Sequence, residues 1–263
     1  LYFTSDEDGG LALVAQVSIE RLLEGIVPAE VYASAPDDAL RAQAVAARSE
    51  LLTDLGARHL ASPYMTCADQ RCQVYRGIGY EDTRTSDAVR ATRGEVMTDG
   101  DEVVKAYFSA NNGGWSASNA STWGEEPRDY LRDHFDGPEA ANRWPEGLAT
   151  ESAVRDFLAS PPDVNADIEN FGGSRTFRWS VTHTGEDLAA SIAERYRDIG
   201  ALRSLRVLER DRSGRATRLE VEGTSGTVVV ERELNIRRAL GGLRSALFVF
   251  AVTDASDGTI ASV

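Results

Sequence analysis

The spacing of hydrophobic residues along this 263-residue chain switches between the period of a helix and the period of a strand. Residues 19–26 and 36–55 carry apolar side chains three and four positions apart, which predicts two amphipathic helices. Residues 175–184 and 202–223 have strand-like spacing, and residues 185–198 between them return to the helical period. We therefore predict an α+β fold, with helices packed on twisted, mainly antiparallel sheets and a groove between an N-terminal and a C-terminal portion.

Proline and glycine mark where these elements stop. Pro28 is expected to end the first helix, the second begins at Pro36, and Gly56 closes it. The pairs Asp99-Gly100 and Ser213-Gly214 are typical of tight turns and predict two β-hairpins.

The acidic composition excludes several classes of partner and cofactor. A net charge of −14 provides no basic excess for phosphates, so nucleic acid and anionic membrane are not expected partners. No apolar run approaches the ~18 residues of a membrane span, and residues 1–17 lack the basic start of a secretory signal. Phosphate-binding and dinucleotide motifs are absent, so we expect no organic cofactor.

Glu30 is the strongest single candidate for chemistry. It stands in the expected break between the two helices, two residues after Pro28 and beside apolar Val31, where burial favours the protonated acid. Such an acid can donate a proton to a leaving oxygen, as glycosidic cleavage requires. The alternative is that Glu30 caps the next helix or pairs with an arginine such as Arg48.

Cys67 and Cys72 are the only two cysteines, and His59 lies eight residues before the first. Both thiolates with the imidazole would supply three zinc ligands, the fourth being water, a carboxylate such as Asp69, or a distant group. A short disulfide and two free buried thiols are the alternatives, and the C-x4-C spacing does not decide among the three. Residues 72–77 are expected to form a short strand.

Residues 111–131 form a polar loop rich in Asn, Gly and Ser that carries two tryptophans and is too long for an ordinary connection. Loops of this composition often bind ligands. A structural Ω-loop anchored by its tryptophans is the competing interpretation.

Several of the residues discussed above belong to a series of longer motifs. In order along the chain, these motifs are LLEGIVPAEV, PDDALRAQAVAARS, CADQRCQVYRGIGY, AVRATRGEVM, KAYFSANNGGWSASNASTWGEEPRDYLRD, RTFRWSVT, DIGALRSLRVLERDRSGRATRLEVEG and LRSALFVF. Together they resemble the SpoIID/LytB family, the stage II sporulation protein D domain of bacterial cell-wall enzymes and amidase enhancers. The resemblance implies a single catalytic domain over residues 1–263. Its expected parts are residues 1–135 with Glu30, a connecting excursion over 136–173 with a helix near 150–158, and an α+β portion over 174–263.

The resemblance implies a peptidoglycan lytic transglycosylase. Such an enzyme cleaves the MurNAc–GlcNAc bond, prefers glycan strands without stem peptides, and leaves 1,6-anhydro-MurNAc ends. The acid of the family's V-P-x-E motif falls on Glu30, which is then the general acid and base. The candidate substrate-binding residues are Gln43, Arg48, Ser109, Asn111, Asn112, Trp115, Ser116 and Trp123. For Arg48 an internal ion pair is the alternative.

Some family members hold a structural metal through one histidine and two cysteines, so the resemblance favours zinc at His59, Cys67 and Cys72 over a disulfide. It also implies an extracytoplasmic location, peptidoglycan strands as the partner and possible cooperation with a cell-wall amidase. Family members usually carry a segment like GWGHGVGMSQWGA, and this sequence does not contain it. If that segment lines the groove, we expect weak glycan binding or no cleavage. A non-catalytic module that enhances an amidase is the alternative function, and a structural envelope protein is the third.

Overall fold

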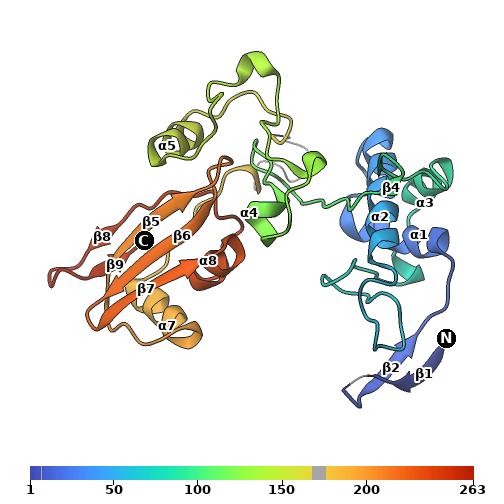
Figure 1. The fold of residues 1–263 in the computed structure, drawn as a ribbon, viewed down its shortest axis with the longest axis horizontal. Helices are drawn as coiled ribbons and strands as arrows, with labels where there is room; N and C mark the ends of the chain where they lie inside the picture. Colours follow the sequence, from blue (N-terminus) through green and yellow to red (C-terminus); the bar gives the residue numbers. More distant parts are fainter. Residues whose placement is uncertain (7, 168–175) are drawn as a thin grey trace. The chain divides into compact units, whose positions relative to one another are not determined.

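The computed structural model describes residues 1–6, 8–167 and 176–263, and the chain divides into two compact units, Leu1–Ser109 and Ala110–Val263 (Figure 1). Both units combine helices with small antiparallel sheets, which confirms the predicted α+β class. The first unit ends at Ser109, earlier than the expected portion ending at residue 135. The groove between an N-terminal and a C-terminal portion stays a prediction.

Three helices form the core of unit 1: α1 (Ile19–Glu30), α2 (Asp37–Asp54) and α3 (Thr83–Ala91). The Ser18 and Asp82 side chains cap α1 and α3 by accepting backbone N–H groups. Alanines on α2 allow close packing of the three helices. The buried core residues are Leu23, Ile26, Val27, Ala44, Ala47 and Val89.

The prediction that Pro28 ends the first helix is wrong, because α1 continues through Pro28 to Glu30. A proline removes only its own N–H donor, and the Val31 N–H closes the last turn on the Val27 carbonyl at 3.0 Å. The backbone becomes extended only at Val31. Glu30 is therefore the last helical residue of α1 and does not lie in a break between helices.

The remaining elements of unit 1 are short. They are β1 (Tyr2–Ser5), β2 (Leu11–Val14), the 3-10 helix η1 (Ile78–Tyr80), β3 (Thr98–Asp99) and β4 (Glu102–Val103). The predicted hairpin at Asp99-Gly100 is confirmed, since β3 pairs with β4 and Gly100 has φ 59°. The strand expected over residues 72–77 is not formed, because this segment bonds to neighbouring helices instead of a partner strand.

Unit 2 is built on a three-stranded antiparallel sheet in the order β5 (Leu202–Arg210), β6 (Ala216–Gly223) and β7 (Gly226–Glu231). The helices α7 (Gly185–Arg195) and α8 (Glu233–Ala239) share one hydrophobic core with it. The predicted turn at Ser213-Gly214 is confirmed, with Gly214 at φ 83°, a conformation that glycine adopts without strain.

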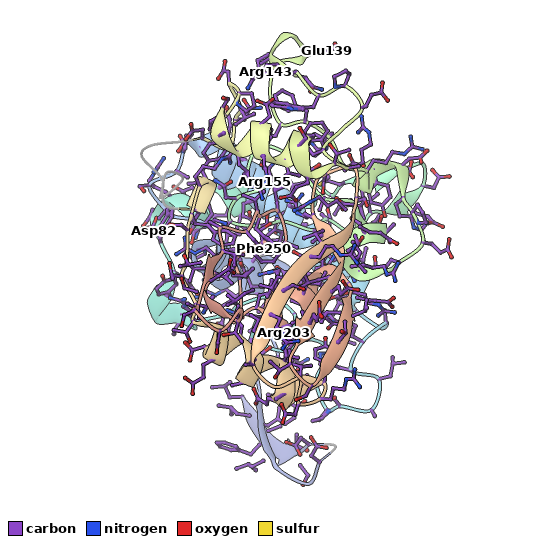
Figure 2. The ribbon with its side chains drawn as sticks, turned by 90° about the vertical axis from the view of Figure 1, so that its left-hand side faces the viewer. Asp82, Glu139, Arg143, Arg155, Arg203 and Phe250 are labelled. Carbon is purple, nitrogen blue, oxygen red and sulfur yellow. A yellow bond between two sulfur atoms is a disulfide. The ribbon has the colours of Figure 1, made fainter. Side chains whose placement is uncertain are left out.

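The rest of unit 2 surrounds this sheet. Its elements are α4 (Asn119–Trp123), η2 (Asp129–Leu131), η3 (Glu139–Ala141), α5 (Glu151–Ala159), β8 (Thr253–Asp254) and β9 (Ile260–Ser262). Helix α5 confirms the helix expected near 150–158 and is tied to the segment after the sheet, because Arg155 donates to the Phe250 carbonyl at 3.4 Å (Figure 2).

The strand predicted over residues 175–184 is not formed in its described part, 176–184, apart from one isolated bridge between Thr184 and Ser262. Residue 175 and the end of the connecting excursion, 168–173, lie outside the described residues. Trp179 packs on the sheet core whereas Val181 is exposed, so the alternation of large residues does not mark a single strand face.

Candidate functional site

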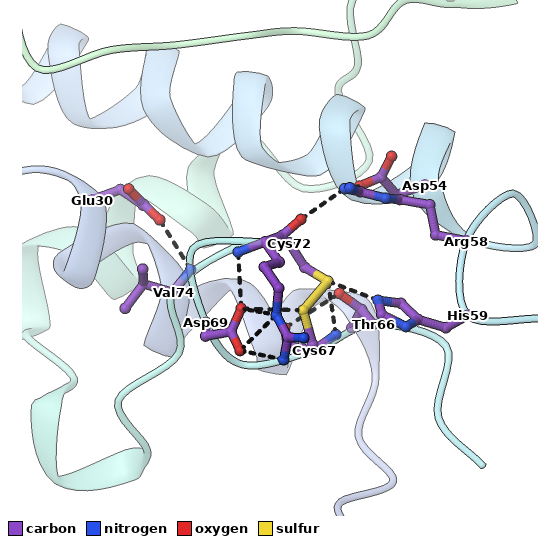
Figure 3. Close-up of a disulfide and its surroundings, with 10 residues drawn as sticks. Glu30, Asp54, Arg58, His59, Thr66, Cys67, Asp69, Cys72 and Val74 are labelled. Atoms are coloured by element: carbon purple, nitrogen blue, oxygen red, sulfur yellow. Dashed lines mark hydrogen bonds and ion pairs between the residues drawn. A yellow bond between two sulfur atoms is a disulfide. The ribbon is translucent and has the colours of Figure 1, made fainter. Parts of the chain in front are cut away.

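Glu30 presents a half-buried carboxylate at the C-terminal end of α1. Its Oε1 accepts the Val74 N–H at 3.0 Å (Figure 3). Within the described part of unit 1, no residue donates a hydrogen bond to the other oxygen, Oε2. One oxygen is thus held in place while the second can exchange a proton with a ligand.

Arg48 forms the internal ion pair that was the alternative to its predicted role as a sugar ligand. Its side chain is 2 % exposed and binds both oxygens of Glu20 on α1 at 2.9 Å. Its remaining N–H groups reach the carbonyls of Val89 and Glu95 at 3.3 and 3.0 Å. The hydrogen bonds from Arg48 to the Glu20 carboxylate lower the pKa of Glu20. Arg48 thus joins α2 to α1 and to the end of α3.

Two glutamines are associated with α2, one on the helix and one packed against it. Gln43 on that helix has its side-chain nitrogen buried and without a partner among the described residues. Gln73 is 4 % exposed and donates its amide to the Ala47 carbonyl at 3.0 Å. The sequence predicted Gln43 but gave no signal for Gln73, whose partner is a main-chain carbonyl.

His59, Cys67 and Cys72 come together as predicted, with their potential ligand atoms all within 4.8 Å of one another. The cysteines form a disulfide, and His59 Nε2 lies 3.1 Å from Cys72 Sγ (Figure 3). Zinc binds thiolates, and disulfide sulfurs carry no such charge. The set fits zinc only after reduction, so the disulfide alternative replaces the expected zinc site here.

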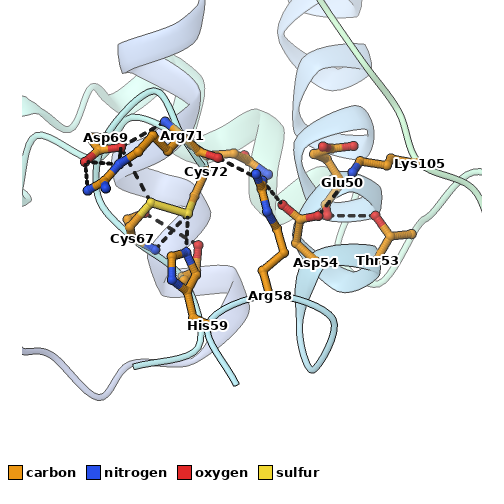
Figure 4. A network of polar contacts seen from close by, with 12 residues as sticks. Glu50, Thr53, Asp54, Arg58, His59, Cys67, Asp69, Arg71, Cys72 and Lys105 are labelled. Atoms are coloured by element: carbon orange, nitrogen blue, oxygen red, sulfur yellow. Dashed lines mark hydrogen bonds and ion pairs between the residues drawn. A yellow bond between two sulfur atoms is a disulfide. The ribbon is translucent and has the colours of Figure 1, made fainter. Parts of the chain in front are cut away.

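An acidic pair at the end of α2 escaped the sequence prediction (Figure 4). Asp54 pairs with Arg58 at 3.1 Å and with Lys105 at 3.4 Å. Burial raises the pKa of Glu50, and the Lys105 charge opposes this rise. The sequence did contain a signal for this pair, because Glu50 and Asp54 are four residues apart and so lie on the same face of a helix.

In unit 2, the asparagines predicted to bind sugar are used to hold their own loop. The side-chain oxygens of Asn111 and Asn112 accept the N–H groups of Gly113 and Gly114 at 2.7 and 2.8 Å. Their amide nitrogens donate to the Ala166 carbonyl and to an oxygen of Asp136, at 2.8 and 3.0 Å. Both side chains therefore have internal partners that orient them, and their role in binding sugar stays a prediction.

Trp115 is a core residue, contrary to its expected role as a sugar platform. It is 1 % exposed, packs edge-on to Phe135 and Phe157, and donates to Asp133 at 3.1 Å. Arg215 donates to the Trp115 carbonyl at 3.1 Å, and burial lowers the pKa of this arginine. The Ω-loop interpretation therefore holds for this part of the loop.

The other predicted ligand residues are more accessible. Trp123, at the end of α4, is 48 % exposed. Ser116 Oγ accepts the His134 N–H at 2.8 Å and lies 2.7 Å from Nδ1 of the same histidine. Ser109 is exposed and is the last residue of unit 1. The predicted ligand residues are thus divided between the two units.

A cavity of about 370 Å³ lies in unit 2 between the start of α5 and the sheet. Its lining includes Glu151, Glu209 and Arg210. Glu151 is bound by Arg210 and by Arg155, at 2.5 and 2.8 Å. Glu209 pairs with Arg218 at 2.5 Å, so each of these charged residues already has an ion-pair partner in unit 2.

Among the described residues, no helix combines the length and the apolar character that crossing a membrane requires.

Family comparisons divide the chain in nearly the same way as its structure. Residues 7–98 match the family described as Stage II sporulation protein (SpoIID). Residues 117–261 match the family described as Domain of unknown function (DUF8618).

Three relatives are similar over part of the chain. The Amidase enhancer of Bacillus subtilis is 33 % identical over 102 residues, 38 % of this chain and 13 % of that protein. Stage II sporulation protein D of the same organism is 27 % identical over 193 residues, 68 % of this chain and 54 % of that protein. An uncharacterized protein of Brachyspira hyodysenteriae is 31 % identical over 114 residues, 43 % of this chain and 31 % of that protein. The chain thus spans about half or less of the length of each relative.

Proposed function

The chain belongs to the family described as Domain of unknown function (DUF8618), and because its residues 7–98 match the Stage II sporulation protein (SpoIID) family, we propose that it is a peptidoglycan lytic transglycosylase. It cleaves the MurNAc–GlcNAc bond of glycan strands that lack stem peptides and leaves 1,6-anhydro-MurNAc ends. The observation that carries the proposal is the Glu30 carboxylate, held at Oε1 by Val74 and without a donor on Oε2 in the described part of unit 1.

A single carboxyl group can perform this reaction. Protonated Glu30 donates its proton to the glycosidic oxygen as the bond from C1 of the muramic residue breaks and an oxocarbenium-like centre develops. The resulting carboxylate then takes the proton from the C6 hydroxyl of the same sugar, whose oxygen bonds to C1. Glu30 ends protonated as it began. Water is not consumed, so the second carboxylate of a hydrolytic glycosidase is not needed.

Sugar recognition would use the accessible members of the predicted set. The exposed ring of Trp123 suits stacking on a pyranose face. Ser109 and Ser116 carry hydroxyl groups that can donate to and accept from sugar hydroxyls. Gln43, on α2 in the same unit as Glu30, completes the candidate set in this proposal.

The disulfide supports an extracytoplasmic location, since disulfides persist mainly in oxidising compartments. There the Cys67–Cys72 bond crosslinks the loop that Glu30 contacts. Under reducing conditions we propose that His59, Cys67 and Cys72 bind a structural zinc ion in its place.

Mass spectrometry of soluble products tests the proposed function. Peptide-stripped and intact peptidoglycan are treated with the wild type, with Glu30→Gln and with Asp38→Asn, whose side chain on α2 is 96 % exposed. We expect anhydro-ended fragments from the wild type and from Asp38→Asn but not from Glu30→Gln. Equal release by Glu30→Gln would refute the role of this acid.

The second candidate is a non-catalytic module that binds peptidoglycan and enhances a separate amidase. The name of the Bacillus relative, Amidase enhancer, favours it. This function predicts that the wild type sediments with insoluble glycan and increases amidase release of peptides without forming anhydro ends. Glu30→Gln would then keep both properties.

A further inference from the structure

The segment from Cys67 to Tyr75, here called the cystine loop, is closed on itself. The disulfide joins Cys67 to Cys72, and the Tyr75 N–H donates to the Ala68 carbonyl at 3.1 Å. The Cys72 N–H also donates to the Asp69 carbonyl at 3.0 Å. Because the disulfide and the backbone hydrogen bonds both close the cystine loop, it is compact, and a few external contacts can fix its position.

Three contacts fix the cystine loop to the helices. The Gln73 amide donates to the Ala47 carbonyl on α2 at 3.0 Å. Arg58, paired with Asp54, donates to the Arg71 carbonyl at 2.8 Å (Figure 4). Tyr75 packs against α1 so closely that a Cβ on Gly25 would collide with its ring.

The Val74 N–H that Glu30 accepts lies between the Gln73 and Tyr75 contacts. It belongs to the peptide plane that joins Gln73 to Val74, and this plane is rigid. The Gln73 contact with α2 holds one side of this plane and the Tyr75 contacts hold the chain just beyond the other side, so together they restrict the direction of the N–H that reaches Glu30.

The chemistry of Gln73 points to the same role. Its side chain is 4 % exposed, and its Oε1 has no partner among the described residues. Burying an amide oxygen without a donor is unfavourable, so an apolar side chain of the same size would suit simple core packing better. The Ala47 carbonyl also needs no extra donor, because the helix already supplies one. The hydrogen bond therefore serves to place Gln73.

We infer that Gln73 is a positioning residue for Glu30: its hydrogen bond to α2 holds the Val74 N–H against Oε1 and leaves Oε2 to exchange the proton with the glycan. The inference rests on the proposed function for its catalytic consequence. The placement itself can be measured without any activity.

Gln73→Met keeps the size of the side chain but removes its amide, and Gln70→Met is the matched control, because Gln70 is exposed in the same loop. We expect kcat of Gln73→Met to fall by about 10- to 100-fold with KM unchanged, as for a displaced catalytic group. Gln70→Met should match the wild type. If circular dichroism shows that Gln73→Met is unfolded, Val74→Pro replaces this variant. Val74→Pro removes the N–H donor itself and should likewise lower kcat and leave KM unchanged.

NMR of the Val74 amide tests the positioning role without any measurement of activity, through its proton chemical shift and its rate of exchange with solvent. In the wild type, Glu30→Gln should shift the Val74 amide proton, and in Gln73→Met the same change should leave it unmoved while Val74 exchanges faster with solvent. An equal shift and equal protection in both backgrounds would overturn the inference. An inactive wild type with the expected amide behaviour would refute the proposed function but support the positioning role.

Discussion

Replacing Arg48 by methionine should destabilise unit 1 by about 3 kcal/mol. Removing one member of a buried ion pair costs about 3–5 kcal/mol because the other charge stays behind without a partner. Arg48 is 2 % exposed, but Glu20 is 27 % exposed, so water partly solvates the remaining carboxylate. The lower end of the range therefore applies, and methionine retains much of the packing of the arginine stem.

The same pair predicts a dependence on pH. Arg48 lowers the folded-state pKa of Glu20, so the pair stabilises the fold above the unfolded-state pKa of this carboxyl. That contribution is lost as the pH falls through the lowered, folded-state value. The difference between the wild type and Arg48→Met should therefore shrink in acid.

The distribution of tryptophan makes the measurement specific to one unit. All four tryptophans, at positions 115, 123, 144 and 179, belong to unit 2. In urea unfolding, Arg48→Met should shift the transition seen by far-ultraviolet circular dichroism and leave the transition seen by tryptophan fluorescence unchanged.

The matched control is Arg41→Met on the same helix, where Arg41 is 54 % exposed and lies 3.5 Å from an exposed Asp38. An exposed pair of this kind is worth less than about 1 kcal/mol. If Arg48→Met lost no more stability than Arg41→Met, the structural role of Arg48 would be refuted and a role in ligand binding would return.

Three further predictions concern both units. Glu50→Gln should stabilise the protein on the order of 1 kcal/mol at neutral pH but not in acid. The reason is that burial raises the pKa of Glu50, so ionisation of this carboxyl destabilises the fold as the pH rises. Thermal unfolding of both proteins at several pH values measures the difference. Reducing Cys67–Cys72 should lower the free energy of unfolding by about 2 kcal/mol, by the loop-entropy relation for so short a loop, measured with and without reductant. Trp115→Ala should destabilise unit 2 by about 3–5 kcal/mol, whereas Trp123→Ala should leave the fold intact and weaken co-sedimentation with glycan.

Local patterns predicted the elements whose boundaries depend on neighbouring residues. The turns containing Gly100 and Gly214 were found, because a tight turn with positive φ is a property of a few adjacent residues. Pro28 misled the prediction because a proline near the end of a helix removes only its own donor, and the last turn closes through Val31.

The roles of polar residues depend instead on where their partners lie. Arg48, Asn111 and Trp115 are chemically suited to binding sugar, and sequence alone does not show whether such a group faces a ligand or the interior. Arg48 donates hydrogen bonds to Glu20, 28 positions away, and Trp115 donates one to Asp133, 18 positions away. Each is thereby used within its own unit.

Gln73 represents the opposite case, a residue that sequence reasoning passed over. Its partner is the main-chain carbonyl of Ala47, 26 positions earlier, and any residue type at position 47 would present the same oxygen. No pairing of side chains could therefore reveal the contact. Its consequence reaches Glu30 through the next peptide N–H, so a search for catalytic side chains alone would also miss it. If the Val74 amide responds to Glu30 as expected, the acid at the end of α1 owes its orientation to a loop that begins 37 positions later, at Cys67.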